Sequence, residues 1–434
     1  MAGVVTAIYD HPVRSRLYIL TLLSLIALLS SYDRYLVAIL VEDIKRDLGA
    51  SDAQMGMLTG FGFACVYSLL AIPVSRMSDG GRRTAVLSLS VGFWCIMTAL
   101  CGLASNFAML LLARLGVAAG EAGSVPTVQA LVADFFPGRW RSTALSITVV
   151  MAGAGFTLAN GGGGWIAEHW NWRAAFMAGA APGPLLAGLL WLTVREPAPT
   201  ASPHVATTRP MGSLAATAHL LQVPTFRHLC LGYALTSIGT YACIAWMPAF
   251  LMRRFAMGAG QVGMSYGIVS GSAMIFALLA GGLLADFLAR RDRRWPLWQI
   301  ALSFGAAFPL TIASLFVDEL NAAMALAIPM TIAIFGCGSV AYNLVMELSG
   351  PHLRATGSAL FLLFVNLFGM GLGPSLVGWL SDLLGSGTGA ASLQYSLAMA
   401  SSTFIGGGIL IALGSRTVRR DIASAHLRGI KHLS

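Results

Sequence analysis

Apolar residues along this chain gather in long runs that short polar segments separate. An α-helix rises about 1.5 Å per residue, so roughly 20 apolar residues are needed to cross a bilayer core about 30 Å thick. Lipid offers no partner to backbone N–H and C=O groups, and the runs lack the period-2 alternation of barrel strands. We therefore predict an all-α, polytopic membrane protein with twelve transmembrane helices, near residues 16–41, 54–75, 84–104, 107–131, 143–165, 173–193, 228–251, 262–285, 297–317, 322–346, 356–380 and 393–414.

A polar segment rich in proline, threonine and histidine separates the first six spans from the last six. It predicts four parts: an N-terminal six-helix bundle (1–194), a cytoplasmic linker (195–227), a C-terminal six-helix bundle (228–414) and a cytoplasmic C-terminal tail (415–434). The halves also repeat one another. Asp79 after span 2 and Asp286 after span 8 are 207 residues apart, and Arg141 and Arg354 after spans 4 and 10 are 213 apart. These offsets indicate duplication of a six-helix unit, and hence two pseudo-symmetric bundles.

Composition and charge fit a membrane chain. Hydrophobic residues make up 56% and charged residues 10% of the chain, against about 25% charged in soluble domains. With the N-terminus inside, 20 of the Lys and Arg residues lie in cytoplasmic segments and five lie outside, namely Lys45, Arg46, Arg173, Arg253 and Arg254. This positive-inside pattern explains the net charge of +9 without nucleic acid. It predicts a multi-pass protein of the cell (inner or plasma) membrane with both termini cytoplasmic.

The six cysteines lie in or beside spans and lack metal-ligand spacing, so they are interpreted as packing residues. The sequence contains no P-loop, which argues against an ATP-driven pump. We expect no metal and no cofactor. The expected partners of a monomeric chain are the bilayer, protons, and a small-molecule or lipid substrate.

An acidic residue followed by paired basic residues after span 2, repeated after span 8 in a six-plus-six layout, resembles the major facilitator superfamily. The loop after span 2 departs from the superfamily pattern, because Ser75 replaces a glycine, Gly80 replaces a basic residue, and the loop is one residue shorter. We therefore expect a weakened gate in the first half. Within the superfamily the chain is similar to the spinster branch. That resemblance rests on Asp33-Arg34-Tyr35, Gly120-Glu121-Ala122, Trp246-Met247-Pro248-Ala249-Phe250-Leu251, Leu353-Arg354-Ala355-Thr356 and Gly378-Trp379-Leu380-Ser381-Asp382.

Four ionisable residues fall within spans, where a charge costs about 3 kcal/mol on insertion scales and is by default a functional hypothesis. Asp33 and Arg34 lie in span 1, and Arg114 and Glu121 lie in span 4, two helical turns apart on one face. If span 1 faces span 4, each carboxylate sits beside a guanidinium. A change in hydration would then load and release a proton, with Glu121 as the first proton-coupling candidate and Asp33 as the second.

When a carboxylate takes a proton, its arginine loses a counter-ion. Arg34 and Arg114 are therefore candidates for binding a substrate carboxylate or phosphate. The alternative is a pair of static ion pairs that fix helix register. Gly116, Gly120 and Gly123 favour open space around Glu121, and with it the proton site.

Two cytoplasmic loops carry the residues expected to form a gate, in which an aspartate at a helix end pairs with basic side chains while the inner side is closed. The residues are Asp79, Arg82 and Arg83 after span 2, and Asp286, Arg290 and Arg291 after span 8. The alternative is that Arg82 and Arg83 act only as topology signals.

Polar and aromatic side chains of the second half are candidates for lining the substrate path, namely Tyr241, Trp246, Tyr342, Asn343 and Asn366. For each of them, a hydrogen bond to a neighbouring helix is the alternative.

Repeated halves favour a carrier that works by alternating access over a channel. A segment at residues 263–267 matches the hydrolase pattern G-x-S-x-G but lacks its strand–turn–helix setting, so we expect no enzyme and regard an intramembrane hydrolase as disfavoured. Arginines in mostly apolar spans favour an amphipathic organic anion, and the spinster resemblance implies a lysolipid- or sphingolipid-like one. We predict a secondary active, proton-coupled transporter. A proton symporter for small organic or aromatic acids and a drug exporter stay open.

Overall fold

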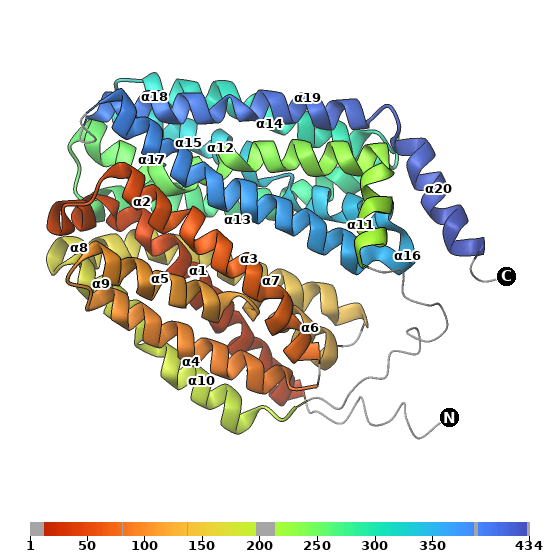
Figure 1. Cartoon of the computed structure of the whole chain (residues 1–434), viewed down its shortest axis with the longest axis horizontal. Helices are drawn as coiled ribbons and strands as arrows, with labels where there is room; N and C mark the ends of the chain where they lie inside the picture. The colour runs from red at the N-terminus through yellow and green to blue at the C-terminus, as the bar shows by residue number, and fades with distance from the viewer. Residues whose placement is uncertain (1–12, 80, 137, 197–212, 386–388, 432–434) are drawn as a thin grey trace.

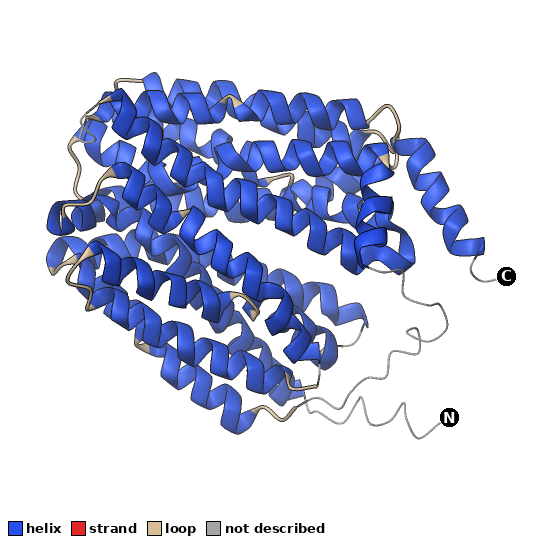
Figure 2. Cartoon of the chain, viewed as in Figure 1, coloured by secondary structure: helices blue, strands red, loops and turns tan. Residues whose placement is uncertain are grey.

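The computed structural model describes residues 13–79, 81–136, 138–196, 213–385 and 389–431. Within these ranges the regular secondary structure is helical, and short loops join the helices (Figure 2). Twelve stretches are long and apolar enough to cross a membrane: Ser15–Leu48, Asp52–Ser78, Arg83–Gly102, Phe107–Phe135, Trp140–His169, Trp172–Thr193, Pro224–Phe255, Ala259–Ala289, Trp295–Phe316, Leu320–Gly350, Thr356–Leu384 and Ala390–Gly414. The predicted all-α fold with twelve spans is confirmed.

Several spans are broken into shorter helices. The first half consists of α1 (Val13–Leu48), α2 (Asp52–Thr59), α3 (Phe61–Asp79), α4 (Arg83–Gly102), α5 (Phe107–Glu121), α6 (Ser124–Phe135), α7 (Gly138–Leu158), η2 (Ala159–Gly163), α8 (Gly164–His169), α9 (Trp172–Ala180) and α10 (Pro182–Thr193). The second half consists of α12 (Pro224–Phe255), α13 (Ala259–Ala289), α14 (Trp295–Phe316), α15 (Leu320–Phe335), α16 (Gly338–Phe364), η3 (Val365–Leu372), α17 (Gly373–Leu384), α18 (Ala390–Ser401) and α19 (Thr403–Gly414). The elements η2 and η3 are π-helical turns.

Two further helices lie in segments that were not predicted to be helical. The predicted linker contains α11 (Ser213–Gln222), and the predicted tail contains α20 (Val418–Lys431). Both pack on α16 and α12 of the second half. Asp421 of α20 accepts hydrogen bonds from the backbone N of Thr225 at 3.0 Å and from its Oγ1 at 2.7 Å, so it caps the start of α12. The bounds of the four predicted parts otherwise stay a prediction.

The two halves meet where α1 packs on α12 and along two further seams that the internal repeat relates. In one seam α2 and α3 pack on α17 and η3, and in the other α7, η2 and α8 pack on α13. Because span 2 corresponds to span 8 and span 5 to span 11, each seam is the counterpart of the other. Glycine permits the close approach. A Cβ at Gly56 would lie 2.6 Å from the carbonyl oxygen of Pro374, and one at Gly263 would collide with the carbonyl oxygen of Asn160.

The helices of the two halves converge toward one end of the molecule and diverge toward the other (Figure 1). We call the end that carries α2, α8 and α17 the closed end, and the end that carries α6, α11, α16 and α20 the diverging end.

The π-helical turns η2 and η3 begin 206 residues apart, close to the offsets of the repeat, and each lies at a seam. Insertions of this kind bend helices and frequently mark functional sites. The repeat therefore extends to local backbone geometry where the halves touch.

Candidate functional site

Asp33 and Arg34 on α1 meet Arg114 and Glu121 on α5, and we call these four side chains the quartet. Arg34 Nη2 donates to Glu121 Oε2 at 2.8 Å, and Arg114 Nη1 lies 3.5 Å from Asp33 Oδ1. Glu121 is fully buried, Asp33 and Arg114 are buried, and the side chain of Arg34 is 23% exposed. The structure thus brings the four predicted ionisable residues together as a formally neutral cluster, with each carboxylate beside a guanidinium.

Side chains of two neighbouring helices hold the quartet in place. Thr98 Oγ1 on α4 donates to Asp33 Oδ2 at 2.5 Å. On α3, Phe63 and Tyr67 stack with ring centroids 6.1 Å apart. The Cζ atom of Arg114 lies 4.9 Å from the ring centroid of Phe63, and that of Arg34 lies 5.2 Å from the ring centroid of Tyr67. Such contacts stabilise a guanidinium where water is scarce. These residues were not predicted from the sequence, although two aromatic residues at i, i+4 spacing in span 2 indicate a shared helix face.

Span 4 is interrupted directly after the proton-site candidate. α5 ends at Glu121, and α6 begins at Ser124. Ser124 Oγ donates to the backbone oxygen of Glu121 at 2.9 Å and so satisfies a carbonyl that the break frees. Span 10 is interrupted between α15 and α16 in the same way. Discontinuous helices of this kind are found where transporters bind their substrates or coupling ions.

The predicted open space around Glu121 is wrong. A Cβ at Gly116, Gly120 or Gly123 would collide with Met97, Trp94 or Val74, respectively. The glycines instead let α3 and α4 pack closely against span 4. Close packing keeps bulk water away from the carboxyl group, which strengthens the electrostatic interactions within the quartet.

Five polar atoms of the quartet are buried and form no hydrogen bond with the described residues: Asp33 Oδ1, Arg34 Nε, Arg114 Nε, Arg114 Nη1 and Glu121 Oε1. Of these, Asp33 Oδ1 and Arg114 Nη1 face each other across the 3.5 Å ion pair. Leaving a buried polar group unsatisfied costs about 1–3 kcal/mol. The quartet therefore retains free capacity, on the carboxylates for a proton and on the guanidinium groups for an anion.

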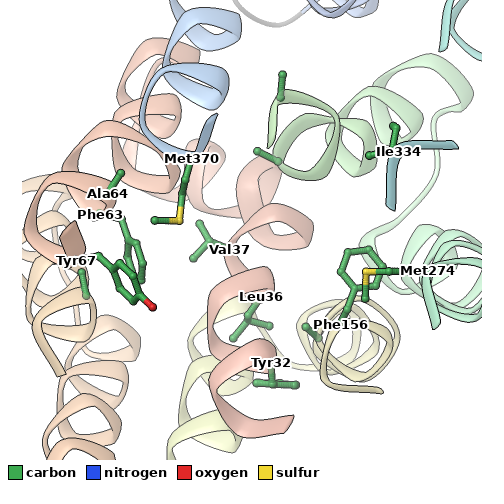
Figure 3. Close-up of a cluster of buried hydrophobic side chains, with 14 of the residues drawn as sticks. Tyr32, Leu36, Val37, Phe63, Ala64, Tyr67, Phe156, Met274, Ile334 and Met370 are labelled. Carbon is green, nitrogen blue, oxygen red and sulfur yellow. The ribbon is translucent and has the colours of Figure 1, made fainter. Parts of the chain in front are cut away.

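Buried apolar side chains from both halves lie next to the quartet. Figure 3 shows Val37 of α1 near Met370 of η3, with Phe63 and Ala64 of α3 beside them. Val37 lies one turn beyond Asp33 toward the closed end, and it is completely buried. An apolar wall shared by both halves therefore lies next to the charged site.

The second-half candidates are placed differently from one another. Tyr241 on α12, Tyr342 on α16 and Asn366 in η3 are half-buried, and Asn343 is exposed. Trp246 is buried, and its Nε1 donates at 2.9 Å to a backbone carbonyl of α17. For Trp246 the structure supplies the helix-to-helix hydrogen bond that was the alternative. The substrate-binding roles of all five stay predictions.

The predicted gate residues lie at the diverging end. Arg83 pairs with Asp134 at the end of α6, and the side chain of Arg82 is exposed. α3 ends at Asp79, whose side chain lies outside the described residues. Their role as a gate stays a prediction.

In the second half, Asp286, Arg290 and Arg291 are exposed at the end of α13, and the guanidinium of Arg291 lies 5.1 Å from the ring centroid of Phe287. The neighbouring Arg293 Nη1 donates to Glu347 Oε1 at 2.8 Å.

The Arg293–Glu347 pair is the counterpart of the Arg83–Asp134 pair. The two basic residues are 210 positions apart and the two acidic residues 213 apart. Each half thus ties the start of its third span to the end of its fourth span.

At the closed end lies an ion-pair network that the sequence analysis missed. Arg253 of α12 donates from Nη1 to Asp52 Oδ2 at 2.8 Å and from Nη2 to Asp52 Oδ1 at 2.6 Å. Its Nε also donates to Glu42 Oε1 at 2.9 Å, and Lys45 pairs with Asp52. Ser381 Oγ of α17 donates to Asp52 Oδ2 at 2.7 Å. Asp52 is completely buried, and its partners come from both halves.

The fold and the site define a class of membrane transporter, and the model of the Major Facilitator Superfamily matches residues 23–374. The chain belongs to this superfamily.

The chain is 37% identical over 405 residues to an MFS-type efflux pump of Mycolicibacterium smegmatis, covering 92% of each chain. It is 26% identical over 442 residues to protein spinster homolog 1 of Xenopus laevis, covering 94% of this chain and 82% of that protein. A crystal structure of a bacterial homologue of the human lysosomal transporter Spinster, inward-facing and unoccupied, superposes with a TM-score of 0.84 at 28% identity, covering 95% of this chain and 99% of that one. The resemblance to the spinster branch is confirmed.

Proposed function

We propose that this transporter moves an amphipathic organic anion, lysolipid- or sphingolipid-like, by proton-coupled alternating access. The observation that carries the proposal is the buried quartet, a neutral cluster of two acids and two arginines with unsatisfied donors and acceptors. One added proton leaves the quartet with a net charge of +1. An anion would restore neutrality, so proton binding and anion binding would favour each other.

In this proposal Glu121 is the first proton site and Asp33 the second; Glu121 is fully buried and bonds to the guanidinium of Arg34. Protonation weakens the charge-assisted bond to Arg34, whose guanidinium then turns to the anionic head of the substrate. Asp33 and Arg114 form the second pair, with Thr98 holding the acid in place. The apolar wall and the aromatic face of α3 suit the lipophilic body of an amphiphile.

We further propose that the diverging end faces the cytoplasm. The five basic residues expected outside belong to helices whose ends lie at the closed end, which agrees with the positive-inside pattern (Figure 1). The conformation described here would then be closed on the outside, where the two halves are in contact.

A second candidate, a proton-exchanging drug exporter, is favoured by the 37% identity to an efflux pump. Its substrate would compete with the proton instead of binding with it.

The two candidates differ in the sign of the pH effect on ligand binding. A fluorescent alkyl sulfonate keeps its negative charge at all relevant pH values, and ethidium keeps its positive charge. If the first proposal holds, the sulfonate binds the purified protein more tightly at about pH 5.5 than at about pH 8.5, because proton binding and anion binding favour each other. Ethidium binding that weakens on acidification, with no binding of the sulfonate, would support the exporter and overturn the first proposal.

A further inference from the structure

At the first seam, a carboxylate of the second half lies on the start of a first-half helix. Asp382 of α17 accepts hydrogen bonds from the backbone N–H of Asp52 at 3.2 Å and of Ala53 at 2.8 Å. These residues begin α2, so the bonds satisfy amides that have no partner within their own helix. A negative charge at this position also complements the helix dipole.

At the second seam, the arrangement is reversed. Glu168 lies in the last turn of α8 of the first half, and its carboxylate lies against the first turn of α13 of the second half. A Cβ at Gly258 would lie 2.5 Å from Glu168 Oε1, and one at Gly260 would collide with Glu168 Oε2. Glycine at these two positions leaves the space that the carboxylate occupies.

The two carboxylates are counterparts under the internal repeat. Asp382 and Glu168 are 214 residues apart, and the helix starts that they face, Asp52 and Ala259, are 207 apart. Each half therefore supplies one carboxylate and receives one. Both contacts lie at the closed end, where the halves converge (Figure 1).

When the halves move as rigid bodies, contacts across the seams break, but contacts within a half persist. Separation of the halves at the closed end breaks every contact across the seams there, whereas Arg83–Asp134 and Arg293–Glu347 stay within their halves. The cap on α2 and the adjoining Asp52–Arg253 pair must therefore break together.

We propose that Asp382 and Glu168 are paired latch residues of the transport cycle. Together they hold the closed end shut, and both must leave the opposing helix before the quartet becomes accessible from that end. The inference rests on the alternating access of the proposed function and identifies the residues that hold the closed end shut.

Amide hydrogen exchange of the full chain, measured by mass spectrometry in lipid nanodiscs without ligand, tests this proposal. Asp382→Ala removes one latch residue. It should raise exchange in the peptide covering residues 50–60, which it touches, and also at residues 256–266 of the other seam. The expected rise is roughly three- to thirtyfold, the factor that corresponds to the loss of a helix cap. Glu168→Ala should give the reciprocal result.

Asp421→Ala is the matched control, because Asp421 caps α12 within one half. It should raise exchange near residues 224–228 and leave both seams unchanged. A rise confined to the seam that contains the substitution, or no rise, would show that the carboxylates are local caps and would overturn the proposal. If Asp382→Ala does not fold, Glu168→Ala decides alone.

The experiment uses neither a ligand nor a pH gradient. Both seams opening together, alongside unchanged proton coupling in Glu121→Gln, would therefore refute the quartet mechanism and leave the latch intact.

Discussion

Replacing Glu121 by glutamine should give, at every pH, the tight anion binding that the wild-type protein shows only when it is protonated. The amide oxygen of glutamine still accepts a hydrogen bond from Arg34, but the charge is gone. A hydrogen bond to a charged group contributes about 1.5–3 kcal/mol and a neutral one about 0.5–1.5 kcal/mol, so the expected loss of stability is about 1–2 kcal/mol. The variant should therefore stay folded.

The guanidinium of Arg34 in Glu121→Gln has lost its counter-ion and keeps only a neutral hydrogen bond, so it can bind an anion at every pH. One charge-assisted bond of about 1.5–3 kcal/mol corresponds to roughly 10- to 150-fold in Kd. We expect the wild-type Kd for a fluorescent alkyl sulfonate to fall by this factor on acidification. The variant should show the tight value throughout.

Fluorescence titration of purified protein across the pH range measures this effect. Glu347→Gln is the matched control, because it makes the same chemical change in an ion pair of the same 2.8 Å length at the diverging end. It should keep the wild-type pH profile. A wild-type profile in Glu121→Gln as well would remove Glu121 from the mechanism.

Three further predictions follow from particular contacts. Phe63→Leu removes the aromatic face from Arg114, so it should lower the stability of the protein by about 1–2 kcal/mol and shift the pH midpoint of sulfonate binding. The control Phe304→Leu, in a stacked pair of the second half, should lower the melting temperature without moving that midpoint. Gly263→Ala should destabilise the protein by about 1–3 kcal/mol in thermal melts, because the new Cβ collides with the backbone of Asn160, while Gly305→Ala, with nothing within 4 Å, should be neutral or stabilising. The hydrogen bond from Arg419 of α20 lowers the pKa of Asp292. This contact should therefore hold α20 in place above the usual pKa of aspartate and weaken only as the pH falls through the lowered value. Protease cleavage of α20 that is unchanged in Asp292→Asn would contradict this.

The spans could be predicted because the length of an apolar run is a local property that the bilayer imposes. Their ends were less accessible. Span 1 was expected to end near residue 41, but α1 continues to Leu48, since Glu42 and Lys45 find ion-pair partners beyond the apolar run. The helix α20 was missed for a related reason. Its sequence is polar, and Asp421 gains its role only from Thr225, far away in the chain.

The quartet could be predicted because charges within a membrane are rare and costly, so the four ionisable residues within spans are easy to recognise in the sequence. Its surroundings could not. Glycine beside Glu121 is compatible with either open space or close packing, and only the positions of Met97, Trp94 and Val74 decide between the two. The network around Asp52 could not be predicted either, because its members are scattered over four helices and its charged members resemble ordinary loop charges.

Substrate flux under an imposed pH gradient, in proteoliposomes that contain the purified protein, tests the central claim most directly. If protons and an amphipathic anion bind the quartet together, an inwardly directed proton gradient drives accumulation of the alkyl sulfonate by the wild-type protein. Glu121→Gln should then exchange the sulfonate across the membrane without accumulating it. Uptake that ignores the gradient in the wild-type protein, or gradient-driven accumulation that persists in Glu121→Gln, would contradict the account.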